Sequence, residues 1–142
     1  MRKDVAKKWI KALRSGKYKK GQGYLKQYTN KGEVRHCCLG VLCELYNDTM
    51  KKNHKKTLNI SRKLHDFEDN EEGFILFNKK SGSLPIVVRK WAGIKDETGE
   101  FTYKVKDRYG EYHDAQNLSV MNDTGSSFST IAKTIEQNID NI

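Results

Sequence analysis

A glycine-rich basic segment, residues 16–23, has the residue types best suited to holding a ligand. Glycine lets backbone amides approach an anion closely, and the lysines of the segment supply positive charge. Tyr18 within the segment, or Tyr24 just after it, can stack on a nucleobase. These features predict an anion-binding loop. The alternative interpretation is a turn that needs glycine and is basic without binding anything.

Residues outside the loop are predicted to complete this site, which we expect to bind a ligand without catalysis. We predict no catalytic residue, no metal ligand and no cofactor. The predicted ligand-binding residues are Arg14, Lys17, Tyr18, Lys19, Lys20, Gly21, Gln22, Gly23, Arg35, Asn122 and Asp123.

The loop is not a Walker A loop, although Gly16 and Gly21 have the required four-residue gap. Gln22 and Gly23 stand where that motif needs Lys and Ser or Thr. The segment also follows a predicted helix rather than a strand. Hydrolysis of a nucleoside triphosphate by this route is therefore not expected.

A second cluster, formed by His36, Cys37, Cys38 and Cys43, contains residue types that bind metals or act as nucleophiles. Zinc sites favour spacings such as Cys-x2-Cys, whereas two of these cysteines are adjacent and the third follows five positions later. In a helix, Cys38 and Cys43 would point about 140° apart. A cysteine nucleophile beside a histidine is the chemical alternative. The apolar neighbours favour simple burial of these thiols.

The charge of the chain is concentrated near its N-terminus. The net charge is +9, and residues 1–31 hold eleven Lys or Arg against one acid, Asp4, which makes that segment +10 and the remainder −1. A basic run at residues 51–56 precedes an acidic stretch, Asp66 to Glu72, which lacks EF-hand spacing and is predicted to be a solvated loop. Such asymmetry favours an anionic partner, either a phosphorylated nucleotide or nucleic acid. The alternative is a solvated lysine-rich face.

The elements that must position these residues follow from periodicity, capping residues and turn chemistry. Residues 50–72 are predicted to be a long, exposed and mobile excursion. The predicted elements are a helix over 4–15, a hairpin of 24–28 with 33–37, a buried helix over 38–46, a strand over 74–77, a helix over 86–93, strands over 101–106 and 111–113, a segment over 118–121, a break at 122–125, and a last helix capped by Ser126 or Ser127.

Together these elements predict one compact α+β domain over residues 1–142, with amphipathic N- and C-terminal helices packed against short antiparallel hairpins. No signal peptide and no apolar run of the length of a membrane span is visible. Three clustered cysteines are typical of reduced thiols. We therefore expect a cytoplasmic protein that does not enter a membrane.

Four segments, in this order, resemble a small protein family widespread in tailed-phage genomes. They are residues 12–18 (ALRSGKY), 37–46 (CCLGVLCELY), 84–94 (LPIVVRKWAGI) and 121–132 (MNDTGSSFSTIA). The resemblance implies a phage accessory role in the cytoplasm of an infected bacterium and carries over no catalytic residues. By analogy of context, it suggests an anti-defence protein that sequesters a cyclic nucleotide immune signal.

Three further hypotheses stay beside the nucleotide binder, which we expect to be a homo-oligomer. The first is a nucleic-acid-binding accessory protein that uses the same lysines against phosphates. The second is an enzyme that uses Cys37 or Cys38 with His36. The third is a protein–protein inhibitor of a host factor.

Overall fold

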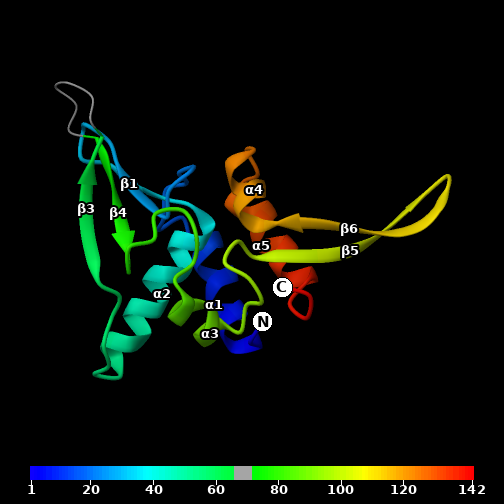
Figure 1. Ribbon diagram of the computed structural model, residues 1–142, viewed down its shortest axis with the longest axis horizontal. Helices are drawn as coiled ribbons and strands as arrows, with labels where there is room; N and C mark the ends of the chain where they lie inside the picture. Colours follow the sequence, from blue (N-terminus) through cyan, green and yellow to red (C-terminus); the bar gives the residue numbers. More distant parts are fainter. Residues whose placement is uncertain (66–71) are drawn as a thin grey trace.

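The computed structural model describes residues 1–65 and 72–142, so most of the predicted acidic loop lies outside the described residues. In the described part of the chain, five helices and two antiparallel sheets form an α+β fold (Figure 1), which confirms the predicted class. In chain order the elements are α1 (Lys3–Arg14), β1 (Lys26–Tyr28), β2 (Val34–His36), α2 (Cys38–Lys52), β3 (Ile60–Leu64), β4 (Gly73–Phe77), α3 (Ile86–Ala92), β5 (Glu100–Asp107), β6 (Gly110–Asn117), α4 (Leu118–Asp123) and α5 (Phe128–Gln137).

The N-terminal helix α1 forms the centre of the core, packed against α2 and α5. Its apolar stripe is fully or almost fully buried, as the helical spacing predicts. Trp9 has no exposed surface, and its indole N–H donates to the Cys38 carbonyl at 2.9 Å. The N-terminal ammonium of Met1 donates to the carbonyls of Ile139 and Ile142, which brings the two ends of the described chain together (Figure 1).

A four-stranded antiparallel sheet, in the order β2-β1-β4-β3, covers one side of α2. The predicted hairpin of β1 and β2 and the predicted strand β4 are confirmed. Within the excursion predicted over residues 50–72, residues 50–52 complete α2 and residues 60–64 form β3, two elements that the sequence analysis did not predict. Every side chain of β3 is exposed, so the strand has none of the apolar alternation by which sequence patterns reveal strands.

The second sheet is a long hairpin, β5 with β6, which projects away from the body of the molecule (Figure 1). The strand predicted at 111–113 extends to Asn117, where the hairpin meets α4. The break predicted at 122–125 begins later, because Asn122 and Asp123 still belong to α4. Ser127 caps α5 through its hydroxyl oxygen, as predicted. Among the described residues, no helix combines the length and apolar character needed to cross a bilayer.

Candidate anion-binding site

A groove of about 490 Å³ lies between α1 and the C-terminal half of α2. Its apolar surface comes from Ala12, Tyr18 and Leu45. Four lysines line it from three segments: Lys8 and Lys11 on α1, Lys17 on the following loop, and Lys52 at the end of α2. Asp48 is the one carboxylate among the described lining residues, so the groove is strongly basic.

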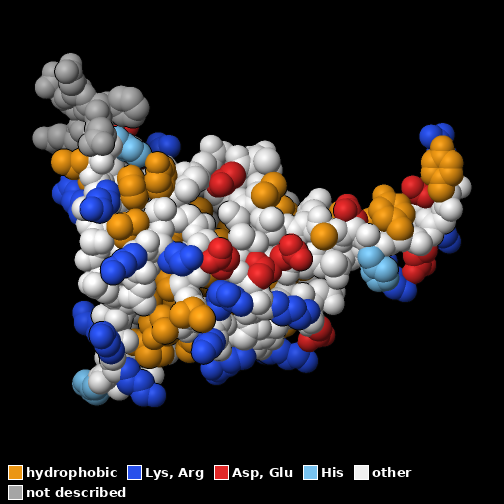
Figure 2. Space-filling view, viewed as in Figure 1, with side chains coloured by type: hydrophobic (Ala, Val, Ile, Leu, Met, Phe, Trp, Pro, Cys, Tyr) orange, Lys and Arg blue, Asp and Glu red, His pale blue; other side chains and the backbone are white. Residues whose placement is uncertain are grey.

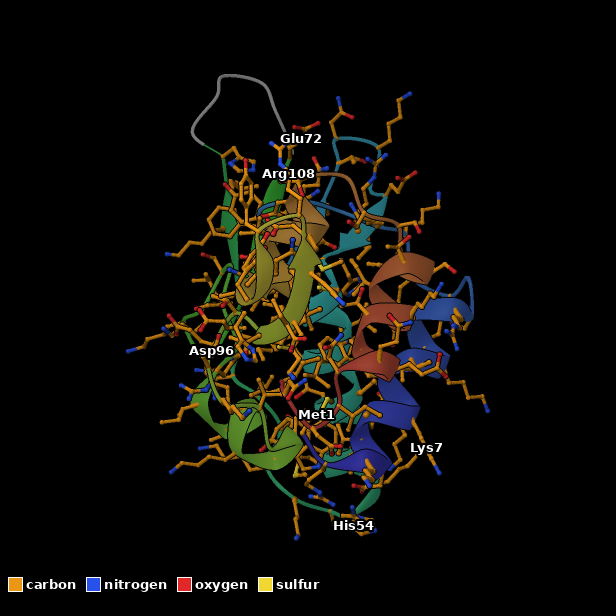
Figure 3. The ribbon with its side chains drawn as sticks, turned by 90° about the vertical axis from the view of Figure 1, so that its right-hand side faces the viewer. Met1, Lys7, His54, Glu72, Asp96 and Arg108 are labelled. Atoms are coloured by element: carbon orange, nitrogen blue, oxygen red, sulfur yellow. The ribbon has the colours of Figure 1, made fainter. Side chains whose placement is uncertain are left out.

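None of the four groove lysines forms an ion pair with a described carboxylate, a condition they share with most cations of the chain, but these four converge on one cavity. Lys17 instead places its ammonium 5.3 Å from the centroid of the Tyr18 ring. Figure 2 shows Lys and Arg side chains along α1 and around the end of α2. Lys7, on α1, and His54, just after α2, are labelled in Figure 3. Uncompensated positive charge around a partly apolar cavity is suited to an anionic organic ligand.

Tyr18 is positioned at the groove by a ring contact with His36, which is itself held by Glu44. Its ring meets the His36 ring edge-on at 5.1 Å between centroids, and His36 Nε2 lies 3.0 Å from Glu44 Oε1. The same carboxylate oxygen accepts from Lys26 Nζ at 2.7 Å. Burial would raise the pKa of Glu44, but hydrogen bonds from His36 and Lys26 hold that pKa below its ordinary value. Glu44 is therefore an anion at neutral pH and can anchor both partners.

The tyrosine itself stays neutral, because burial raises the pKa of the Tyr18 hydroxyl above its ordinary value despite the nearby Lys17 ammonium. A half-buried neutral phenol presents a ring face for stacking and an O–H for hydrogen bonding. Both properties suit contact with a nucleobase or ribose.

The structure separates the residues predicted to form one site into three places. Lys17 and Tyr18 line the groove. Arg14 lies on another side of α1, where it pairs with Glu136 at 3.0 Å. The others belong to a second, smaller cavity of about 320 Å³ or to its surroundings, namely Lys20, Gly21, Gln22 and Arg35 in its lining, and Lys19, Gly23, Asn122 and Asp123 around the same loop.

The glycine loop uses its backbone donors within the protein. Gly21 N–H donates to the His36 carbonyl at 2.7 Å, and Gly23 N–H donates to the Asp123 carboxylate at 2.9 Å. The side chain of Asp123 thus occupies the position that sequence analysis reserved for an external anion. Lys20 Nζ likewise donates to the Asn122 carbonyl at 2.7 Å. The loop is held to α4, and its two innermost glycine amides already have partners.

Sequence reasoning missed Lys8, Lys11 and Lys52 as members of one site. Lys8 and Lys11 are three residues apart and share one side of α1, a signal that a helical projection contains. Lys52 lies some forty residues later, and only the packing of α2 on α1 brings it to the same groove. The smaller cavity is a weaker candidate, because its charged residues Lys20 and Arg35 are engaged by Asn122 and Glu33.

The cysteine cluster is part of the core, as the flanking residues predict. Cys37, Cys38 and Cys43 are all buried and free. Burial raises the pKa of Cys37 to about 11 and raises the pKa values of Cys38 and Cys43 as well. A thiol with so high a pKa holds almost no thiolate at neutral pH, and the thiolate is the reactive form. Within the described residues, no three His, Cys, Asp or Glu side chains gather as a metal site.

We therefore expect all three thiols to resist alkylation in the folded protein. Iodoacetamide at pH 7.5 should label the native chain at least about 100-fold more slowly than the same chain in urea, because both burial and the raised pKa values suppress attack. Mass spectrometry of the labelled chain over time measures both rates. Rapid modification of Cys37 or Cys38 in the native state would contradict the buried placement and revive the nucleophile hypothesis.

Comparison with known proteins gives one match. A family model described as a domain of unknown function (DUF8296) matches residues 1–139. No curated protein and no solved structure matches the chain.

Proposed function

The chain belongs to the DUF8296 family of domains of unknown function, and from the groove we propose that it binds and sequesters a phosphorylated nucleotide without transforming it. The observation that carries this proposal is the set of four groove lysines, which face a partly apolar cavity without a described carboxylate as partner. Ammonium groups that converge on one cavity and have no carboxylate partner are available to an anionic ligand. A phosphate supplies the complementary charge.

The size and lining of the groove support a nucleotide over a bare phosphate. Its volume of about 490 Å³ lies in the range of sites for small organic ligands. Tyr18 and Leu45 can contact a base, while Asp48, Thr49 and Asn53 offer polar groups to a ribose or base edge. The described lining contains no His and no Cys, and its one carboxylate is Asp48, a composition that supports binding rather than chemistry.

The resemblance to a tailed-phage family supplies a biological setting for such a binder. A phage accessory protein in the cytoplasm of an infected bacterium could remove a cyclic nucleotide immune signal by tight, stoichiometric binding. This role requires affinity and abundance but no catalytic group.

Nucleic acid is the second candidate ligand, because the basic surface continues beyond the groove. Lys3 and Lys7 on α1 and Lys51, Lys55 and Lys56 at and after the end of α2 are all exposed. A polyphosphate backbone could follow such a surface, whereas a small nucleotide could not use it. A binding constant whose logarithm falls linearly with the logarithm of salt concentration, and which increases with strand length, would identify nucleic acid as the ligand.

Charge reversal in the groove tests the proposal. We expect Lys11→Glu with Lys52→Glu to weaken nucleotide binding at least about 100-fold, since each change replaces an attraction to phosphate by a repulsion. Isothermal titration calorimetry with cyclic di-AMP, cyclic ADP-ribose and ATP, at about 150 mM salt, measures affinity and stoichiometry. Lys31→Glu with Lys90→Glu is the matched control, because it changes the net charge equally at two exposed lysines outside the groove.

The outcomes separate the two ligand classes. Saturable binding of one nucleotide per groove, lost in the groove variant and kept in the control, supports the proposal. Binding of only single-stranded DNA or RNA, with an affinity that increases with strand length, identifies the extended basic surface along α1 and the end of α2 instead. Retention of full nucleotide affinity by the groove variant would show that the site lies elsewhere.

A further inference from the structure

The β5–β6 hairpin, termed the arm below, leaves the body of the molecule (Figure 1); Phe101 and Tyr103 at its base pack on the core, and no described residue covers either face nearer the tip. Phe101 at its base is 4% exposed, whereas no residue from 102 to 117 is buried. Eight-residue strands make the arm about 27 Å long. Arg108 marks its tip, which points toward the viewer in Figure 3. A two-stranded hairpin alone is marginally stable in water, so an arm of this length needs a surface to pack on.

The two faces of the arm differ in chemistry. The register pairs Tyr103 with Asp114 and Val105 with Tyr112, so these four side chains share one face, here termed the arm face. Its only charged groups are carboxylates, Asp114 and Asp107 toward the tip. The opposite face carries both lysines of the strands, and Lys104 there pairs with Glu111 at 2.8 Å. The arm face is therefore apolar and acidic.

A partly exposed apolar surface with one cation lies on the four-stranded sheet. Val34, Tyr28 and Leu64 share one row across the strands, and Ile75 and Arg62 share the next row on the same face; these five residues are termed the sheet patch. Val34 is 44% exposed and Leu64 60% exposed, large values for apolar side chains. Arg62 lies 3.9 Å from the Tyr28 ring centroid and has no described carboxylate as partner.

The arm and the sheet patch cannot meet within one chain, because the arm and the four-stranded sheet lie at opposite ends of the molecule (Figure 1). Two copies can bring them together. We propose that the arm face of one copy packs on the sheet patch of a second copy, with one of the arm carboxylates directed to Arg62. The arm segment 100–117 has three cations and four carboxylates, a net −1, whereas the rest of the chain is +10.

This charge balance also argues against nucleic acid as the occupant of the arm, since the arm face has no cation to offer a phosphate. Against a second copy of the same chain, both the apolar packing and the charge complementarity of the arm are favourable. Apolar side chains of two sheets can interdigitate, and each acidic arm meets a basic body. The contact joins two different surfaces, so it closes as a dimer by reciprocal exchange or continues as a chain of copies.

Complementation between two variants tests the contact. Tyr112→Glu places a carboxylate on the arm face, and Val34→Glu places one on the sheet patch next to Tyr28. We expect the wild-type chain to self-associate below about 200 µM and each variant alone to associate at least about 100-fold more weakly. A mixture of the two variants should regain a heterodimer, because one intact arm still meets one intact patch. Sedimentation velocity with one variant fluorescently labelled measures this.

His113→Glu is the control, because it adds the same charge one residue along, on the opposite face of the arm. It should associate as the wild type does, and circular dichroism should show every variant folded. A wild-type chain that stays monomeric at about 200 µM would overturn the proposal. Self-association that survives Val34→Glu would overturn it too, since the arms would then be pairing with each other. Tyr112→Glu should bind nucleotide as the wild type does, because the groove contains no arm residue. Nucleotide titration of this variant therefore tests the groove separately from self-association.

Discussion

Replacing Gly40 with alanine is expected to prevent the chain from folding, although alanine is the better helix former. Gly40 lies in the first turn of α2, and a Cβ added there would overlap the carbonyl oxygen of Leu25 and come within 2.5 Å of its carbonyl carbon. Real side chains do not approach backbone this closely. Either α2 or the segment before β1 must therefore move.

Neither element is free to move. The Leu25 carbonyl accepts from Cys37 N–H at 3.3 Å, directly before α2, and Leu25 N–H donates to the Ser81 carbonyl. Leu25 and Leu39 have no exposed surface, so a shift of either would open the core. Alanine gains at most about 1 kcal/mol over glycine in helix propensity. Displacing packed backbone costs several times more, and we expect a loss of at least about 4 kcal/mol, a large part of the stability of a chain of this size.

Gly82→Ala is the matched control for this substitution. The nearest atom to a Cβ at Gly82 is the Gly23 carbonyl oxygen at 3.3 Å, and the backbone there does not require a left-handed conformation. Urea unfolding followed by tryptophan fluorescence should show a near-normal midpoint for Gly82→Ala and no cooperative transition for Gly40→Ala. A Gly40→Ala protein with a normal midpoint would show that α2 does not pack on Leu25 in this way.

The helices were predictable because their buried stripes and caps are local. Val5, Trp9 and Leu13 repeat at helical spacing in α1, and the Ser127 hydroxyl marks the start of α5. The strand β3 was not predictable, because pairing with β4 orders it while all its side chains stay in solvent. A strand whose side chains are all exposed in the single chain leaves no apolar alternation in the sequence.

The candidate site was predictable only in part, because part of it depends on tertiary packing that leaves no local signal in the sequence. Tyr18 and Lys17 were found from composition, and both line the groove. The position of Lys52 beside them depends on how two helices pack, which spacing does not encode. The glycines of the loop were predicted to hold an external anion, whereas the Gly23 N–H donates to the protein's own Asp123. A basic, glycine-rich loop has the same composition whether its partner is external or internal.

Substitution of Asn122 is expected to lower the stability of the fold strongly, because this residue holds the glycine loop to α4. Its side chain is fully buried and joins three segments distant in sequence. The amide oxygen accepts from Cys38 N–H at 3.1 Å at the start of α2, and the amide nitrogen donates to the Gly21 carbonyl at 2.8 Å and to Asp123 Oδ1 at 3.0 Å. The same carboxylate oxygen binds Gly23 N–H, so Asn122 fixes the whole loop to α4.

We therefore expect Asn122→Asp to destabilise the fold by about 3–5 kcal/mol, since it replaces the only donor to Gly21 among these groups by a buried oxygen facing a carbonyl and a carboxylate. Asn122→Ala should cost less, about 2–3 kcal/mol, because it leaves two buried groups unpaired without adding a charge. Asp123→Asn is the control, since its amide oxygen can still accept from Gly23 N–H. Urea midpoints give the three values. If Asn122→Asp were as stable as Asp123→Asn, the side chain of Asn122 could not be the link between the loop and α4, and the loop would be free to accept an external anion after all.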